Sequence, residues 1–144
     1  MAKQEAKVDL WVAKQLDKAE IVDYDPQGSD VLELNEALKT ASKTGKGGPG
    51  YPEYVAVVRD YVIVIEDKPN LDYHIKLNND GVVELSDAKA VRDYAVNGAI
   101  HYARHIATKS GFKKVFALGV SGNEKYHRIT PYYVDDRGEF KQLD

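Results

Sequence analysis

Two short, strongly apolar runs that are separated by only two residues constrain the fold more than any other feature of the chain. Residues 54–58 and 61–65 consist of Tyr, Val, Ile and Ala, and only Arg59 and Asp60 lie between them. Runs of this length and composition are typical of β-strands, and so short a connection requires a tight antiparallel hairpin. Because the second run is apolar at every position, we expect it at the centre of a sheet with both faces covered.

Helices are predicted on both sides of the hairpin, and more strands follow it. Apolar residues at spacings of three and four are typical of amphipathic helices. The apolar stripe of the first predicted helix consists of Ala6, Leu10, Ala13 and Leu16. Besides the hairpin, the predicted elements are helices at residues 4–19, 30–42 (after a cap at Ser29 or Asp30) and 87–110 (after a cap at Ser86 or Asp87), and strands at residues 21–24, 115–120 and 128–134. This order predicts an α/β (α+β) fold with a mixed central sheet flanked by helices.

Charge and composition exclude several classes of protein. The 20 Lys and Arg residues against 23 Asp and Glu residues give a net charge of −3 at pH 7. This balance excludes a strongly basic nucleic-acid coat and a polybasic membrane anchor, but it is compatible with a basic groove on an acidic body. The absence of cysteine excludes a disulfide scaffold, a thiolate nucleophile and any Cys-ligated metal centre.

No membrane or export signal is recognised in the sequence. The first residues are charged, and no apolar signal-peptide core follows them. The longest apolar run, residues 62–65, has the length of a strand, whereas a membrane-spanning helix needs roughly 20 residues. We therefore expect a cytoplasmic protein without a membrane partner. Residues 1–144 have the size of one domain, which we expect to be a fragment of a larger polypeptide.

Charged residues gather where the predicted hairpin begins and where it ends. Glu53 precedes the first strand and follows a Gly-rich stretch at residues 44–50, while Glu66 and Lys68 end the second strand. In a tight hairpin that start and that end lie side by side, and strand alternation places Glu66 and Lys68 on the same face. The two carboxylates and the ammonium group are therefore expected within reach of a single point.

This grouping of charges favours a metal site over a solvated surface. Charges at strand ends are usually solvated or form weak surface ion pairs, but charges at the end of a buried apolar strand need compensation. We therefore expect a hard divalent cation held by Glu53 and Glu66, with Asp67 contributing its backbone carbonyl. Such a site leaves positions for a phosphodiester, and Lys68 would orient the attacking water or stabilise charge on the phosphate oxygens.

The same residues carry a resemblance to a nuclease family. The segments at residues 50–53 and 62–68 resemble the PD-(D/E)xK nuclease superfamily, with Glu53 in place of the first Asp. Flanking segments at residues 38–43, 93–103 and 114–122 are similar to the N-terminal nuclease region of restriction–modification polypeptides in which an N6-adenine DNA methylase follows. The resemblance covers roughly residues 30–135.

The resemblance implies a restriction-endonuclease-like fold and hydrolysis of DNA phosphodiester bonds with Mg²⁺, or with Mn²⁺ as the alternative ion. Carried over position by position, it makes Glu53 and Glu66 metal ligands and Lys68 the catalytic lysine. Family members also place an acidic residue of the preceding helix near the metal. Here Glu33 and Glu36 are the candidates, and Glu36 is closer in helical phase to the core-facing stripe. The implied partners are double-stranded DNA and further domains of the same polypeptide, a methylase and a target-recognition domain.

Several further residues are candidates for contacts with DNA. Lys43 and Lys46 flank the Gly-rich stretch, where ammonium groups and backbone N–H groups can contact phosphates. Related nucleases of type I restriction systems carry Gln and Tyr four residues apart on the helix after the motif. In this chain Tyr102 is preceded at that distance by Gly98, with Asn97 beside it. The alternative interpretation of this segment is close packing of the helix on the sheet.

Other interpretations of the chain remain open at the level of sequence. His101 and His105 have a spacing that can bind zinc, but no third ligand lies at a convincing distance along the chain, and a solvated helix face is the alternative. The whole domain can also be read as a catalytically inactive DNA-binding or interaction module, or as an RNA nuclease or repair enzyme with the same core. The charge balance provides too little basic surface for tight DNA binding by this chain alone.

Overall fold

The computed structural model describes residues 2–19, 21, 24–26, 31–44 and 47–143, and within them six strands form one mixed sheet in the order β1-β2-β3-β4-β5-β6. The strands are β1 (Tyr24–Pro26), β2 (Tyr54–Val58), β3 (Tyr61–Lys68), β4 (Lys114–Gly122), β5 (His127–Val134) and β6 (Phe140–Gln142). The helices are α1 (Ala2–Lys18), α2 (Leu32–Ala37), α3 (Ala88–Asp93) and α4 (Ala95–Lys109), with a 3₁₀ turn η1 at Leu71–Tyr73. None of these helices has the length and apolar content needed to cross a membrane.

The predicted hairpin is confirmed, and its second strand is central. β3 pairs antiparallel with β2 and parallel with β4, and the tight turn between β2 and β3 places Arg59 at a φ of +58°. β3 is longer than its apolar run, because Glu66, Asp67 and Lys68 continue the pairing with β4. The charged residues at the end of the run are therefore part of the sheet.

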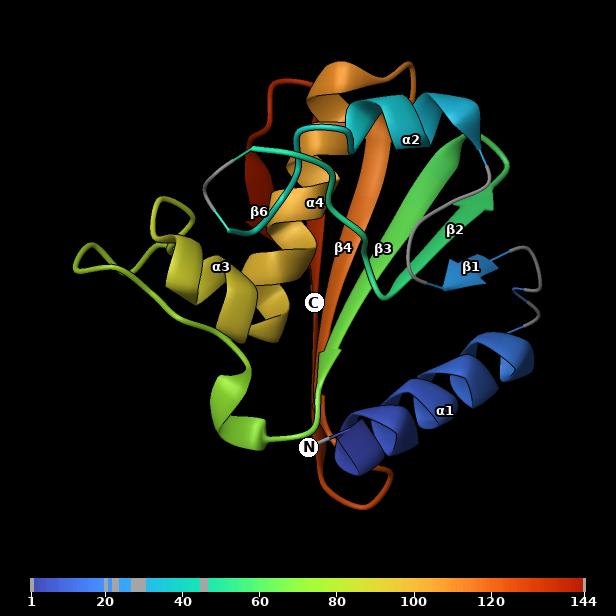
Figure 1. The fold of residues 1–144 in the computed structure, drawn as a ribbon, viewed down its shortest axis with the longest axis vertical. Helices are drawn as coiled ribbons and strands as arrows, with labels where there is room; N and C mark the ends of the chain where they lie inside the picture. Colours follow the sequence, from blue (N-terminus) through green and yellow to red (C-terminus); the bar gives the residue numbers. More distant parts are fainter. Residues whose placement is uncertain (1, 20, 22–23, 27–30, 45–46, 144) are drawn as a thin grey trace.

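The two faces of the sheet are covered by different helices (Figure 1). Val62 and Val64 of β3 belong to the main core, which α2 and α4 complete on one face. Ile65 belongs to a smaller cluster under α1 on the other face, with Ile63 packed against it. The expected mixed sheet flanked by helices is thus confirmed, and it is compatible with a restriction-endonuclease-like fold.

The prediction of one continuous helix at residues 87–110 is wrong, because two helices, α3 and α4, occupy this segment. The predicted start of the helix is confirmed. Asp87 caps α3 by accepting a hydrogen bond from the Lys89 backbone N–H at 3.1 Å. The chain then becomes extended at Tyr94 before α4 begins. Here the Val96 N–H donates to the carbonyl of His74, 2.8 Å away, so a contact with a distant segment replaces a turn of helix. Gly119 of β4 leaves room for Val96, since a Cβ there would lie 2.5 Å from its side chain.

The N-terminal elements differ from the prediction in their bounds and in one buried face. The predicted caps Ser29 and Asp30 lie outside the described residues, as do residues 22–23 of the predicted strand. α2 ends at Ala37, well before the predicted residue 42. The carbonyl of Leu38, which would continue the helix, accepts a hydrogen bond from the Gly50 N–H. The stripe predicted for the first helix is misplaced, since Leu10 is 64% exposed. The residues of α1 that are buried on the sheet are Val8, Trp11, Val12 and Leu16.

Candidate functional site

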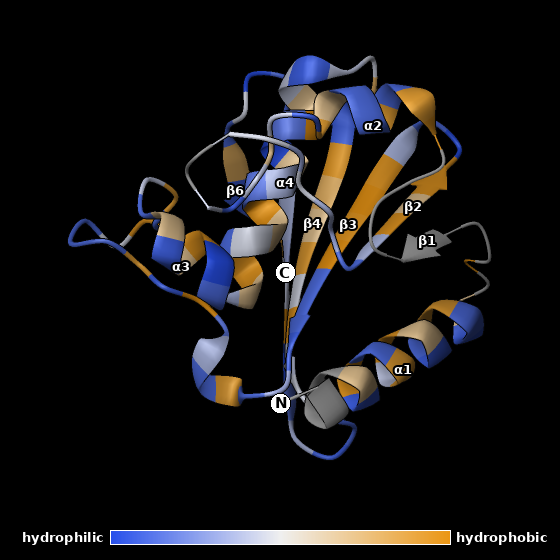
Figure 2. Cartoon of the chain, in the orientation of Figure 1, coloured by the Kyte–Doolittle hydropathy of each residue, from blue (hydrophilic) through white to orange (hydrophobic). Residues whose placement is uncertain are grey.

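The end of β3 carries two neighbouring carboxylates that are buried on opposite faces of the sheet. Glu66 is 2% exposed and Asp67 is 5% exposed. Because side chains alternate along a strand, Glu66 faces α4 and Asp67 faces α1. Figure 2 shows β3 changing from hydrophobic to hydrophilic toward this end of the strand. The environments of these two carboxylates define the site.

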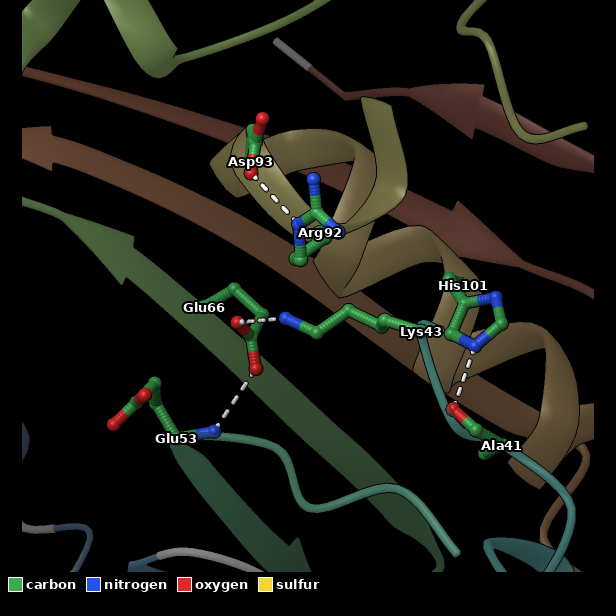
Figure 3. Close-up of polar contacts among 7 residues, drawn as sticks. All are labelled: Ala41, Lys43, Glu53, Glu66, Arg92, Asp93 and His101. Atoms are coloured by element: carbon green, nitrogen blue, oxygen red, sulfur yellow. Dashed lines mark hydrogen bonds and ion pairs between the residues drawn. The ribbon is translucent and has the colours of Figure 1, made fainter. Parts of the chain in front are cut away.

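On the α4 face, both oxygens of Glu66 accept hydrogen bonds. Oε1 accepts from the backbone N–H of Glu53, and Oε2 accepts from Nζ of Lys43, each at 3.0 Å. Figure 3 shows Lys43 extended from its loop to Glu66, with the Glu53 carboxylate turned away from this pair. Burial lowers the pKa of Lys43, but attraction to Glu66 outweighs this effect and the pKa lies above its usual value. The pair is therefore charged and compensated.

On the α1 face, three carboxylates from three elements come together. Asp9 of α1, Glu53 at the start of β2 and Asp67 of β3 each place one oxygen within 4.8 Å of the others. Oδ1 of Asp9 and Oδ2 of Asp67 are buried and accept no hydrogen bond from an N–H or hydroxyl donor of any described residue, and the two carboxyl groups lie close enough to share a proton. The hydroxyl of Tyr54 donates to the backbone carbonyl of Asp9 at 2.7 Å and so holds this part of α1 against the sheet. We call these three residues the carboxylate trio.

The electrostatics of the trio favour the uptake of protons or of a cation. Burial raises the pKa of Asp67 well above its usual range, and a hydrogen bond with Asp9 and the charges of the neighbouring Asp9, Glu53 and Glu66 carboxylates raise it further. Burial, followed by repulsion from Glu66 and Asp9, raises the pKa of Glu53 to about 7, against the attraction of Lys43 and Lys68. Crowded buried carboxylates of this kind need a positive charge between them.

The donor set of the trio fits a hard divalent cation. Mg²⁺ and Mn²⁺ prefer oxygen ligands, and all three donors are carboxylate oxygens. Two oxygens bound to one Mg²⁺ lie at most about 4.2 Å apart, so side-chain adjustments of under about 1 Å would bring the three oxygens, now within 4.8 Å, onto one ion. The buried oxygens of Asp9 and Asp67 without hydrogen-bond partners are the ones that such an ion would satisfy.

The structure brings most of the residues expected from the motif to one place, but in an unexpected arrangement. The Glu53 backbone meets Glu66 on one face of the sheet, the Glu53 carboxylate meets Asp67 on the other, and Lys68 is near enough to Glu53 to influence its charge. Asp67 contributes its side chain rather than the carbonyl that was expected. Glu36 is not part of this group, because its exposed side chain lies 3.9 Å from Lys39 in an ion pair.

Asp9 was missed by sequence reasoning. It is 44 positions from Glu53, and no motif connects the two residues. One signal was available, because Asp9 precedes the buried Val12 and Leu16 by three and seven residues and thus lies on the buried face of α1. The misplaced apolar stripe concealed this position.

The residues predicted to contact DNA are engaged within the protein wherever they are described. Asn97 is fully buried and its amide bonds to the backbones of Lys76 and Glu84. Tyr102 is buried, with the Lys43 ammonium 5.1 Å from its ring centre. Lys46 lies outside the described residues.

Close packing of α4 on the site is the role that the structure gives to Gly98. A Cβ added there would lie 3.0 Å from the carbonyl oxygen of Val91, a tight contact, and at ordinary contact distances of 3.4 Å from Nζ of Lys43 and 3.5 Å from Cγ of Glu66. The absence of a side chain at this position therefore lets α4 approach α3 closely, directly beside the buried ion pair. The packing interpretation of this helix segment, weighed from the sequence, fits these distances.

Among the described residues, the histidine pair on α4 has no third His, Asp or Glu ligand close enough to complete a zinc site. Nε2 of His101 bonds to the carbonyl of Ala41 at 2.7 Å (Figure 3), and Nδ1 of His105 bonds to the carbonyl of His101 at 3.0 Å. Burial lowers the pKa of His101 to about 4, so the ring is neutral at neutral pH and holds the loop through Ala41.

Comparison with known proteins links the chain to restriction and modification. The sequence is 40% identical over 124 residues to the type II restriction enzyme and methyltransferase RM.BcgI of Heyndrickxia coagulans. The match covers 85% of this chain, and the chain spans only 19% of the length of that relative. No family model matches the sequence, and no solved structure matches it.

Proposed function

We propose that this chain is the DNA-cleaving unit of a restriction–modification polypeptide, a Mg²⁺-dependent endonuclease that hydrolyses phosphodiester bonds. The observation that carries the proposal is the carboxylate trio, in which two buried oxygens meet no N–H or hydroxyl donor among the described residues, with Lys68 near enough to lower the pKa of Glu53. The 40% identity to a restriction enzyme and methyltransferase supports the same conclusion. A site that needs a cation, next to a lysine, is suited to phosphoryl chemistry.

The residues have separate roles in this proposal. Glu53 and Asp67 hold the cation, Mg²⁺ or Mn²⁺, which when bound supplies Lewis-acid activation of water and neutralises phosphate charge. Glu66 fixes the backbone at Glu53 through Oε1, and since each carboxylate oxygen has two lone pairs it can also ligate without losing its hydrogen bonds. Lys68 orients the attacking water and stabilises the negative charge that develops on the phosphate.

Recognition of DNA is assigned to other parts of a larger polypeptide. The net charge of −3 provides little nonspecific attraction to double-stranded DNA, the proposed substrate. The relative is about five times as long as the matched region and is named as a methyltransferase as well as a restriction enzyme. We therefore propose that a methylase and a target-recognition domain act together with this unit.

Cleavage of supercoiled plasmid DNA tests the proposal. With Mg²⁺ or Mn²⁺ the wild-type chain should nick the plasmid, and Lys68→Ala should lower the rate by about 10²–10³-fold without unfolding the protein. Lys89→Ala is the matched control, because Lys89 is an exposed lysine of α3. Cleavage that persists in excess EDTA, or that is equal in Lys68→Ala and wild type, would contradict the proposal. No cleavage with either ion, when the chain is also joined to the proposed methylase and target-recognition domains, would favour the inactive-module interpretation.

A further inference from the structure

We infer that a polar hollow beyond the end of β3 receives one unstacked nucleobase of the DNA strand, next to the phosphate that lies at Lys68. The inference rests on the proposed function for its ligand, DNA, and adds to that function a base-binding site within this unit. The hollow has a volume of about 470 Å³, within the range of about 300–1,000 Å³ that is usual for small-ligand sites. We call it the polar hollow; it is lined by residues 69–72, Gly122, Asn123 and Tyr126.

The polar hollow directly adjoins the strand end that carries the charged site residues. β3 ends at Lys68, and the wall formed by residues 69–72 follows immediately. The opposite wall is the loop between β4 and β5, which begins beyond Ser121, the residue that pairs with Lys68 (Figure 1). Asn70 is two residues past Lys68 and so at most about 7 Å along the chain from it. This reach corresponds to about two nucleotide steps of roughly 3.4 Å, so a base close to the phosphate at Lys68 can enter the hollow.

The loop wall is held in place by hydrogen bonds of its own. Oδ1 of Asn123 accepts from the backbone N–H groups of Lys125 and Tyr126, at 2.9 and 3.0 Å. The Asn123 N–H donates to the carbonyl of Tyr126 at 2.8 Å. Gly122 permits this closure, since its φ is +98° and a Cβ there would collide with the Tyr126 carbonyl and lie 2.9 Å from Cδ2 of Leu71. The two walls are thus positioned without a ligand, which lowers the entropic cost of binding one.

Two asparagine side chains of the polar hollow keep NH₂ groups for a ligand. Oδ1 of Asn70 accepts from the Asp72 N–H at 2.8 Å, and Oδ1 of Asn123 is occupied by its own loop. These bonds fix which end of each amide is the oxygen, because an NH₂ group cannot accept from an N–H. Within the described part of the chain, neither NH₂ group has an acceptor. Asp72 adds an exposed carboxylate, which accepts hydrogen bonds only.

This combination of groups fits a nucleobase better than a phosphate. The Asp72 carboxylate repels a phosphate, and its backbone N–H is already bound by Asn70. A base offers donors and acceptors on its edge together with an aromatic face. Tyr126 is 70% exposed at the hollow, and exposed aromatic rings are the surfaces on which unpaired bases stack. Because base edges of a duplex lie inside its grooves, a concave site takes a base that has left the stack.

The experiment compares two short single strands that have the same number of phosphates and differ by one base. Both consist of abasic residues, and one of them carries a single central thymine. The wild-type chain is titrated with each strand in EDTA at low ionic strength, while NMR follows the side-chain NH₂ signals of Asn70 and Asn123. The thymine strand should bind at least about tenfold more tightly than the base-free strand and should shift both signals. EDTA makes this result independent of metal and of cleavage.

Substitutions of exposed side chains separate stacking from charge. Tyr126→Ala should weaken binding of the thymine strand by about tenfold and leave binding of the base-free strand unchanged. Tyr126→Phe keeps the ring and should bind as the wild type does. Asp72→Asn should strengthen binding of the base-free strand by about threefold, because it removes a charge that repels phosphate. Asp80→Asn is the matched control, the same change at an exposed position that does not line the hollow, and should have no effect.

Each outcome bears on the inference or on the proposed function. Equal binding of the two strands, or an equal effect of Tyr126→Ala on both, overturns the inference, because only phosphate contacts would then be made. No binding of the thymine strand, or shifts confined to residues outside the polar hollow, overturns it as well. These results leave the proposed function standing, since plasmid cleavage with Mg²⁺ tests it separately. Base-dependent binding by a chain that does not cleave DNA, even when joined to the proposed further domains, supports the inference and contradicts the proposed function.

Discussion

Glu66 and Asp67 are consecutive in the chain and almost equally buried, yet their surroundings are opposite. On the α4 face, both oxygens of Glu66 are satisfied by Lys43 and by the Glu53 backbone. On the α1 face, Asp67 meets two further carboxylates, and one of its oxygens has no partner among the described residues. The comparison teaches that burial of a charge does not indicate its role. A compensated charge contributes to stability, and an uncompensated one marks a site where a ligand belongs.

The largest expected difference between the two faces is in stability. Glu66→Ala leaves the Lys43 ammonium buried without its partner and removes the acceptor of the Glu53 N–H, so it should lower the free energy of unfolding by about 3 kcal/mol. Asp67→Ala removes a carboxyl group that burial keeps in its neutral form, and it should cost far less in the absence of metal. Urea denaturation of both variants measures the difference. Equal losses would mean that the two faces do not differ as described.

The second prediction reverses the sign on the α1 face. Asp67→Asn keeps the shape of the side chain and replaces a carboxyl group, which must lose its proton to bind a cation, by an amide that can donate to Asp9. Without metal, this variant should match the wild type near neutral pH, where the raised pKa of Asp67 keeps its carboxyl group protonated, and should be about 2 kcal/mol more stable above about pH 10, where the wild-type carboxyl group loses its proton. Mg²⁺ should stabilise the wild type and leave the variant nearly unchanged, as measured by thermal unfolding with and without EDTA. A destabilised variant in EDTA would contradict the proposed repulsion.

The third prediction concerns pH, in the absence of metal. The pKa of Glu53 is raised from 4.5 to about 7, so between these values the folded chain holds more protons than the unfolded chain. The free energy of unfolding must then fall as pH rises through this window, and the stabilising effect of the proton is lost above about pH 7. Glu53→Gln should abolish this pH dependence. From about pH 5 to about pH 8 the variant should therefore gain about 1 kcal/mol of unfolding free energy relative to the wild type. A constant difference would mean that Glu53 titrates normally.

These predictions depend on a hairpin that the sequence alone was sufficient to specify. Two apolar runs and a two-residue turn determine the pairing of β2 and β3, and that register places Glu53 beside the end of β3. The alternation of side chains also follows from strand geometry. The local pattern therefore predicted that Glu53 and Glu66 converge, and it predicted that a sheet flanked by helices surrounds them.

The features that were missed depend on contacts between distant segments. Asp9 joins the site because α1 packs across the sheet, and the apolar spacing of α1 fits more than one helix face until that packing is known. The break at Tyr94 has the same origin, because Val96 bonds to His74 rather than within a continuous helix. Periodicity describes an element by itself, whereas these positions are determined by what the element contacts.

The smallest expected effect separates the two helices that offer an acidic residue to the site. Glu36 of α2 has an exposed side chain that is 64% accessible and lies 3.9 Å from Lys39, and exposed pairs of this kind contribute little. Glu36→Gln should therefore change the free energy of unfolding by less than about 0.5 kcal/mol and leave Mg²⁺ binding unchanged. Asp9→Asn, the same class of substitution on α1, should weaken Mg²⁺ binding, and isothermal titration calorimetry of the two variants compares them directly. If Glu36→Gln weakens Mg²⁺ binding instead, the acidic ligand comes from α2 and α1 is only a cover on the sheet.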